Sequence, residues 1–180
     1  MLSLDSGNFV LRPTSDEDVP SIVEAVHESA ATVGAWMNWA TSSYSHAEAI
    51  AWIRACEVSR AEGTGYEFGI FSSATGRFVG AAGLNQFNKV YNFCNLGYWV
   101  RESAQRQGVA TAAVAALRNY AFNGLGLTRV EIVAAVSNGA SLSVARRAGA
   151  TLECTARNRL QLHGRPVDAC VFSFIPAPGA

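Results

Sequence analysis

Apolar positions recur with a helical period at two places in the first half of the chain. They stand three and four residues apart over 19–26, and Ile50, Ile53 and Cys56 repeat that spacing further on. Both stretches therefore predict amphipathic helices, the second of which is expected to continue through Arg60. Each is preceded by a hydroxyl residue with a glutamate three positions later, the pattern of a capping box: Thr14 with Glu17, and Ser45 with Glu48.

Other stretches of the first hundred residues have the short, dense apolar pattern of strands. The runs 9–12, 66–71, 77–84 and 96–100 are rich in apolar, β-branched and aromatic residues, with turn residues between them. The second and third runs are separated only by 72–76, so we expect them to pair as an antiparallel hairpin.

The second half alternates strands with helices. Helical spacing begins at Val109 and extends to Ala121, and another helix is expected to open at 137–141 and to end at Gly149. The strands expected here are 127–136, 150–156 and 167–175. The pattern as a whole predicts an α/β fold, a mixed sheet of about seven strands with four helices.

Composition fits a single globular domain over 1–180, with 175–180 as a loose tail. The chain has 180 residues, of which 49% are hydrophobic and 16% charged, so a full core is expected. Basic and acidic residues balance at 14 each, which gives no electrostatic reason to expect a nucleic-acid partner. No signal peptide or membrane span is recognisable, and the four cysteines are not clustered, so we expect a cytoplasmic protein without a metal site.

The stretch Gln105-Arg106-Gln107-Gly108-Val109-Ala110 carries the first chemical signal, because it joins the strand 96–100 to a helix. At such a junction unpaired backbone N–H groups and the positive end of the helix dipole point to one spot, which suits a phosphate or pyrophosphate. Gly108 leaves room for an anion to approach the backbone. No lysine and no Gly-x-Gly-x-x-Gly accompany it, which argues against a nucleotide-hydrolase loop and a dinucleotide fold.

This loop resembles the acetyl-CoA loop of the GCN5-related N-acetyltransferases. Asn138-x-x-Ser141, at the start of the later helix, is similar to a second motif of that family, and the opening around Leu11-Arg12-Pro13 is similar to its ribosomal-protein N-terminal acetyltransferase branch. The resemblance implies the acyltransferase fold and acetyl-CoA as cofactor. The cofactor-binding residues that it implies are Trp99, Val100, Arg101, Gln105, Arg106, Gln107, Gly108, Val109, Ala110, Thr111, Asn138 and Ser141.

The reaction implied is direct transfer of an acetyl group from a thioester to an amine. Backbone groups of Trp99 to Arg101 would hold the thioester, and Ser141 would donate to the departing thiolate, although Asn138 and Ser141 also fit a simple helix cap. The branch leads us to expect a carboxylate base within 157–162, where this chain has no acid. Glu67 is our candidate base, with Glu102, His163 and Asp168 as the others.

Tryptophans in the segment 30–44 are candidates for the acceptor side. Large aromatic residues without a clear period either fill the core or form pocket walls, and the resemblance favours substrate contact for Trp36 and Trp39, together with Asn85. An α-amine with a pKa of ~8 costs about 1.4 kcal/mol to neutralise at pH 7, whereas a lysine at ~10.4 costs roughly 4.6 kcal/mol.

A chain without an obvious base therefore favours an α-amine as acceptor, either a peptide N-terminus or a small-molecule amine such as an amino-acid conjugate or antibiotic. A catalytically weak acyl-CoA-binding module is the alternative, because the expected carboxylate is absent from 157–162. The resemblance leaves a homodimer open.

Overall fold

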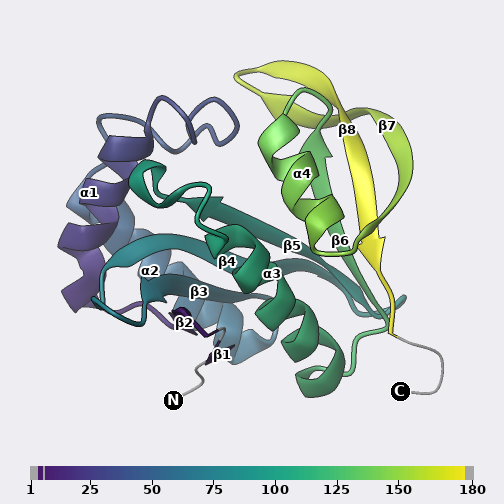
Figure 1. Cartoon of the computed structure of the whole chain (residues 1–180), viewed down its shortest axis with the longest axis horizontal. Helices are drawn as coiled ribbons and strands as arrows, with labels where there is room; N and C mark the ends of the chain where they lie inside the picture. The colour runs from purple at the N-terminus through teal and green to yellow at the C-terminus, as the bar shows by residue number, and fades with distance from the viewer. Residues whose placement is uncertain (1–3, 6, 177–180) are drawn as a thin grey trace.

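A single mixed sheet forms the centre of the computed structural model, which describes residues 4–5 and 7–176 (Figure 1). Within those residues the sheet has eight strands in the order β1-β2-β3-β4-β5-β6-β8-β7. All neighbours pair antiparallel except β5 and β6, which pair parallel. The strands are β1 (Leu4–Asp5), β2 (Phe9–Arg12), β3 (Tyr66–Ser72), β4 (Phe78–Asn88), β5 (Phe93–Val100), β6 (Arg129–Ala135), β7 (Thr151–Leu162) and β8 (Arg165–Phe174).

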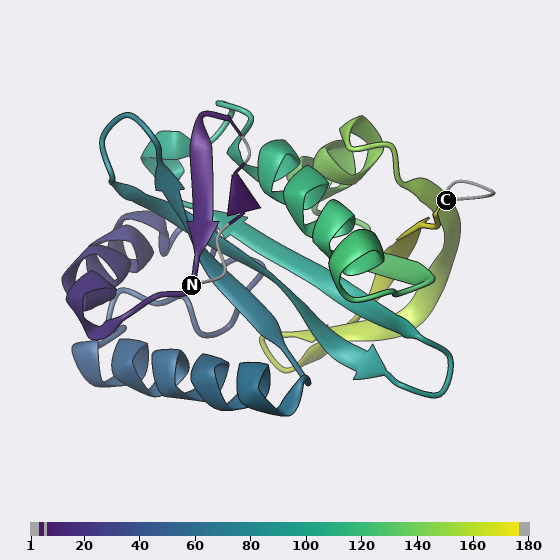
Figure 2. The ribbon, with the colours of Figure 1, turned by 90° about the horizontal axis from the view of Figure 1, so that it is seen from below.

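In the described part of the chain, four α-helices cover the two faces of this sheet, two on each (Figure 2). One apolar cluster joins α1 and α2 to one face through Ile22, Ile53 and Phe78. The other joins α3 and α4 to the opposite face through residues such as Leu117 and Leu142. The helices are α1 (Val19–Ser29), α2 (His46–Glu62), α3 (Val109–Asn119) and α4 (Gly139–Arg147), with shorter turns at Asp16–Asp18, Glu102–Ala104 and Tyr120–Gly124.

The predicted α/β fold is confirmed, with differences at the ends of elements. The additional strand β1 is too short to give a pattern of its own, and it pairs with β2. The first capping box is formed by Ser15 and Asp18 rather than by Thr14 and Glu17, because Asp18 also accepts two bonds from Arg12. The prediction that Ile50 faces inward is wrong.

Ile50 is 41% exposed, because Ala49 and Ile53 form the buried stripe of α2. The strands β4 and β7 also run further than expected, to Asn88 and Leu162, which places 157–162 in a strand. Of the predicted tail, Ile175 and Pro176 follow β8 outside any strand, and 177–180 lie outside the described residues. Among the helices that the structure describes, none is long and apolar enough to span a membrane.

The strands β5 and β6 separate from each other along their length. They pair only over Phe93–Asn95 and Arg129–Glu131. Beyond that point β5 remains paired with β4, and β6 with β8, so the two halves of the sheet diverge. Because of this divergence, the facing edges of 96–100 and 132–135 do not pair with each other. The candidate site lies between these two edges.

Candidate active site

A cavity of about 810 Å³ lies where β5 and β6 diverge. Its walls come from both strands, from the loop before α3, from the first turns of α3 and α4, from the segment after α1 and from the end of β7. The residues that the sequence predicted as cofactor or substrate contacts and that line it are Trp36, Trp99, Val100, Gln105, Arg106, Gly108, Val109, Ala110, Thr111, Asn138 and Ser141.

The loop before α3 presents backbone donors to this cavity. Gly108 has φ of +82° and Arg106 has φ of +62°, so two left-handed residues turn the chain sharply into the helix. The first intrahelical bond is from Ala112 N–H to the Gly108 carbonyl, which leaves the N–H groups of 109–111 without helical partners. A Cβ built at Gly108 meets no atom within 4 Å, so the space in front of these donors is open.

The charges that line the cavity are of one sign. Arg106 and Arg147 are its only charged lining residues within the described chain, and no carboxylate is among them. Together with the free amides at the positive end of α3, these two guanidinium groups form a site suited to an anion. Coenzyme A, with its pyrophosphate and its further phosphate, matches this arrangement in charge.

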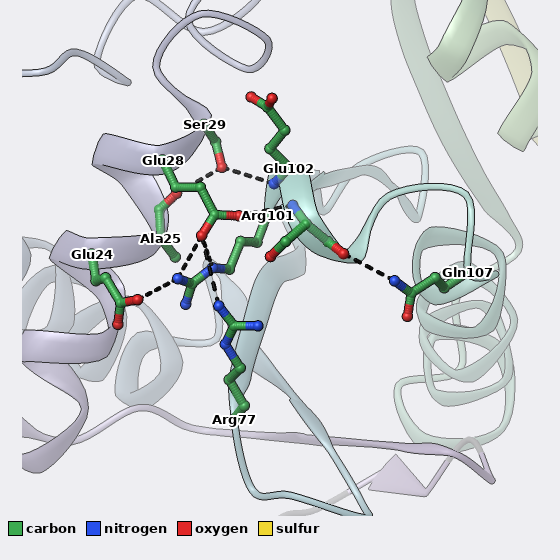
Figure 3. A network of polar contacts seen from close by, with 9 residues as sticks. Glu24, Ala25, Glu28, Ser29, Arg77, Arg101, Glu102 and Gln107 are labelled. Atoms are coloured by element: carbon green, nitrogen blue, oxygen red, sulfur yellow. Dashed lines mark hydrogen bonds and ion pairs between the residues drawn. The ribbon is translucent and has the colours of Figure 1, made fainter.

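An ion-pair network fixes the start of the loop before α3 to α1 (Figure 3). The side chain of Arg101 is only 2% exposed. Its Nε donates to Glu28 Oε2 over 2.5 Å, and its NH2 group donates to Glu24 Oε1 over 2.5 Å. Arg77, which immediately precedes β4, forms an ion pair with Glu28 at 3.7 Å between its NH2 group and Glu28 Oε2. These bonds hold the pKa of Glu28 at about 2, mainly through the hydrogen bond from Arg101.

The C-terminal end of α1 also forms hydrogen bonds with the backbone of this loop (Figure 3). Glu102 N–H donates to Ser29 Oγ over 3.0 Å, and Ser103 N–H donates to Glu28 Oε1 over 2.8 Å. Gln107 Nε2 closes the turn by donating to the Ser103 carbonyl over 2.9 Å. The loop that presents the amide donors is thus held in place by α1, which is remote in sequence.

Arg101 therefore has a different place from the predicted one. Its backbone N–H donates to the Val79 carbonyl over 2.9 Å, so it is not free for a thioester, and its side chain turns away from the cavity. The prediction that Arg101 supplies a backbone donor is wrong, because β4 still pairs with the chain at that point. The amide of Gln107 is likewise used inside the loop, and Gln107 is not a lining residue.

Ser141 lies at the start of α4 beside a tyrosine that the sequence did not single out. Tyr98 Oη is 2.9 Å from Ser141 Oγ, and it also donates to the Ser141 carbonyl over 3.1 Å. Burial raises the pKa of Tyr98 to about 12, so the phenol keeps its proton at neutral pH. Asn138 Oδ1 accepts from Ser141 N–H over 3.1 Å, so the capping function predicted for Asn138 is present as well.

The other end of the cavity is apolar. Trp36 and Met37, after α1, share its lining with Leu160 and Leu162 near the end of β7. The turn after β7 reaches the same segment, because His163 N–H donates to Asn38 Oδ1 over 3.1 Å. Leu160 and Leu162 were missed because the strand was expected to end at residue 156. Their spacing of two residues places both side chains on one face of a strand, and this was the signal that could have shown them.

Besides Arg101 and Gln107, three predicted residues lie outside this lining. Trp39 packs against Trp99 at 5.7 Å between ring centroids, behind the cavity wall, and is 43% exposed. Glu67 and Asn85 lie in the sheet and bond to each other, Asn85 Nδ2 donating to Glu67 Oε1 over 3.0 Å. Their predicted functions, like those of the lining residues, remain predictions.

Known proteins are similar to this chain in sequence and in fold. Residues 8–151 match the model of the acetyltransferase (GNAT) domain family. YdaF of Bacillus subtilis, which has a provisional assignment as a ribosomal N-acetyltransferase, is 29% identical over 173 residues, 93% of this chain and 91% of YdaF.

Two solved structures superimpose over nearly the whole chain. A Vibrio cholerae protein provisionally assigned as a ribosomal-protein-serine acetyltransferase is 32% identical, with a TM-score of 0.84 over 97% of this chain and 98% of its own. The ribosomal L7/L12 alpha-N-protein acetyltransferase RimL, solved with coenzyme A, shares the fold with a TM-score of 0.88 at 23% identity, over 97% of this chain and 98% of its own. The chain belongs to the GNAT family, in its ribosomal-protein acetyltransferase branch, and is an acetyl-CoA-dependent N-acetyltransferase.

Proposed function

We propose that the protein transfers the acetyl group of acetyl-CoA to the α-amine of a polypeptide N-terminus. The observation that carries this choice is the lining of the cavity, which holds two arginines and apolar residues but no carboxylate among the described residues. No lining residue can therefore neutralise a strongly basic amine directly. An α-amine, with a pKa of ~8, needs about 3 kcal/mol less than lysine to become neutral at pH 7.

Relatives support a protein substrate of this kind. The names of YdaF and of the Vibrio cholerae protein refer to ribosomal N-acetylation and to a ribosomal-protein serine. An extended N-terminus fits the apolar end of the cavity, where Trp36, Met37, Leu160 and Leu162 would surround its first side chain.

Each part of the chain then has a defined task. Acetyl-CoA supplies a thioester whose carbonyl carbon accepts the amine. The N–H groups of 109–111 and the guanidinium of Arg106 bind the phosphates. Ser141 holds a hydroxyl proton at the cavity wall for the departing sulfur, and the Tyr98 phenol, which stays protonated, orients that hydroxyl.

The test compares two peptides of matched sequence with acetyl-CoA. One has a free N-terminus and no lysine, and the other has a blocked N-terminus and one lysine. We expect kcat/KM for the free N-terminus to exceed that for the lysine peptide by at least about tenfold at pH 7. A preference for lysine contradicts the proposed acceptor, and coenzyme A binding without transfer to any amine would identify an acyl-CoA-binding module.

A further inference from the structure

A carboxylate and two amides form a row across the middle of the sheet. Glu67 of β3 is paired with Gly83 of β4, and Gly83 is paired with Gly97 of β5. Beside them, Asn85 Nδ2 donates to Glu67 Oε1 over 3.0 Å and Asn95 Nδ2 donates to Asn85 Oδ1 over 2.9 Å. The amides hold the carboxylate in one orientation.

Two glycines keep the space beside this carboxylate clear. A Cβ at Gly83 would lie 2.0 Å from Glu67 Oε2, so the carboxylate occupies the place of a side chain there. At Gly97 a Cβ would meet nothing closer than Asn85 Nδ2 at 3.8 Å and Asn95 Nδ2 at 3.9 Å.

Gly97 itself lines the cavity. Paired strands lie about 4.8 Å apart, so the carboxylate, which lies over Gly83, is about one strand spacing from the cavity wall at Gly97, with the Asn85 amide beside the gap. One water molecule bridges such a distance.

The surroundings of Glu67 favour the protonated form of its carboxyl group. Glu67 is partly buried, and burial raises its pKa, against the opposing charge of Arg60 on α2. The other titratable neighbour on α2 is Cys56, whose thiol has its pKa raised to about 12 by burial and is therefore neutral. On the far side of the row, Glu131 of β6 is already paired with Arg129.

We propose that Glu67 is the proton acceptor of the acetyl transfer described above, and that it is reached by one water over Gly97. The acceptor ammonium gives one proton through that water to the Glu67 carboxylate, and the free amine then forms a bond to the acetyl carbon. As the carbon–sulfur bond breaks, the nitrogen loses a second proton and the thiolate takes up one. The products are the amide, the free thiol and one proton returned from Glu67 to solvent.

The decisive variant is Glu67→Gln, whose side chain can still accept the bond from Asn85. Below the pKa of Glu67 the wild-type kcat/KM should rise with pH at a slope of one in logarithmic terms and then level off, because an ionised Glu67 accepts the proton of the ammonium substrate. The variant should instead keep a slope of one up to the pKa of the amine, because only the free amine can then react, with kcat/KM reduced about 10–100-fold near pH 7. Identical profiles in the two proteins would overturn the assignment.

A second variant separates proton acceptance from a structural role. The bond from Asn85 lowers the pKa of Glu67, so Asn85→Leu should move the change of slope to higher pH without changing the affinity for coenzyme A. A lower rate with the change of slope at its original pH would mean that the row only supports the sheet.

The profiles are measured with whichever peptide the wild-type protein acetylates faster. If that is the lysine peptide, the acceptor class proposed above is wrong and Glu67 is still tested. If neither peptide reacts, the carboxyl carbon of Glu67, identified by its loss in Glu67→Gln, is titrated by NMR. A pKa above the ordinary range of glutamate is expected, and an ordinary value would overturn the assignment.

Discussion

The two ends of the cavity are built in different ways. At the end proposed to bind phosphate, the phosphate end, neighbouring residues in sequence provide backbone N–H groups, and a glycine with a left-handed conformation opens the space. At the end proposed to receive the acceptor, the acceptor end, Trp36, Trp99 and Leu160 come from three distant segments and contribute side chains. A site made by local backbone can be recognised in a short motif, whereas a site made by distant side chains becomes visible only when the sheet is assembled.

The largest effect is expected at the phosphate end, from Gly108→Asn. Asparagine tolerates a left-handed conformation, so the loop should keep its shape while a side chain enters the anion site. We expect the Kd for coenzyme A to rise about 100-fold, as calorimetric titration would show, because two or more charge-assisted bonds are lost. Gly76→Asn is the matched control, since Gly76 also has a positive φ of +69° and open space but lies in a hairpin turn. Equal affinities in both variants would contradict the anion site.

The side chains of Ser141 and Tyr98 are expected to affect the rate of transfer instead of the affinity for coenzyme A. Ser141→Ala should lower kcat about 10–100-fold with little change in the KM for acetyl-CoA, because the hydroxyl is needed when the thiolate forms. Tyr98→Phe should lower kcat by about tenfold, and the double variant should be no slower than Ser141→Ala if the phenol acts only through that hydroxyl. Additive losses in this cycle would give Tyr98 a separate function.

At the acceptor end, the loss of one wall should weaken only the acceptor. Trp36→Ala removes a large apolar surface, worth about 1.5–3 kcal/mol, and should raise the KM for the peptide by roughly tenfold while the Kd for coenzyme A stays constant. Trp39→Ala, behind the wall, should have a smaller effect on that KM. A larger effect from Trp39 would place the acceptor outside the cavity described here.

The smallest effect concerns stability at acid pH. The pKa of Glu28 is about 2 in the folded protein, below its ordinary value near 4.5, so its contribution is complete above about pH 5 and is lost as the pH falls toward 2. Urea unfolding should show Glu28→Gln less stable than the wild type by about 1–2 kcal/mol at pH 7 and equally stable near pH 2. Glu153 titrates in the same range in both proteins, so only their difference is informative.

The local geometry of the phosphate end could be predicted from sequence because it follows from local order, whereas phosphate binding there stays a prediction. The loop 105–110, the cap formed by Asn138 and the helix after each strand all depend on residues a few positions apart. The contact of Tyr98 with Ser141 crosses 43 residues, and no period links the two. The prediction for Arg101 failed because a match to a family motif does not show whether a backbone N–H is already hydrogen-bonded. In this chain the Arg101 N–H donates to the Val79 carbonyl.

Anchoring by α1 also has a consequence for the order in which the protein folds. The hairpins of β3, β4 and β5 need only contacts between neighbouring strands, whereas Glu28 and Ser29 meet the loop across more than 70 residues of chain. Contacts of such separation carry a larger loop-closure cost and form slowly. The sheet can therefore assemble before the loop preceding α3 is fixed, so during refolding the recovery of coenzyme A binding should lag behind the recovery of strand structure.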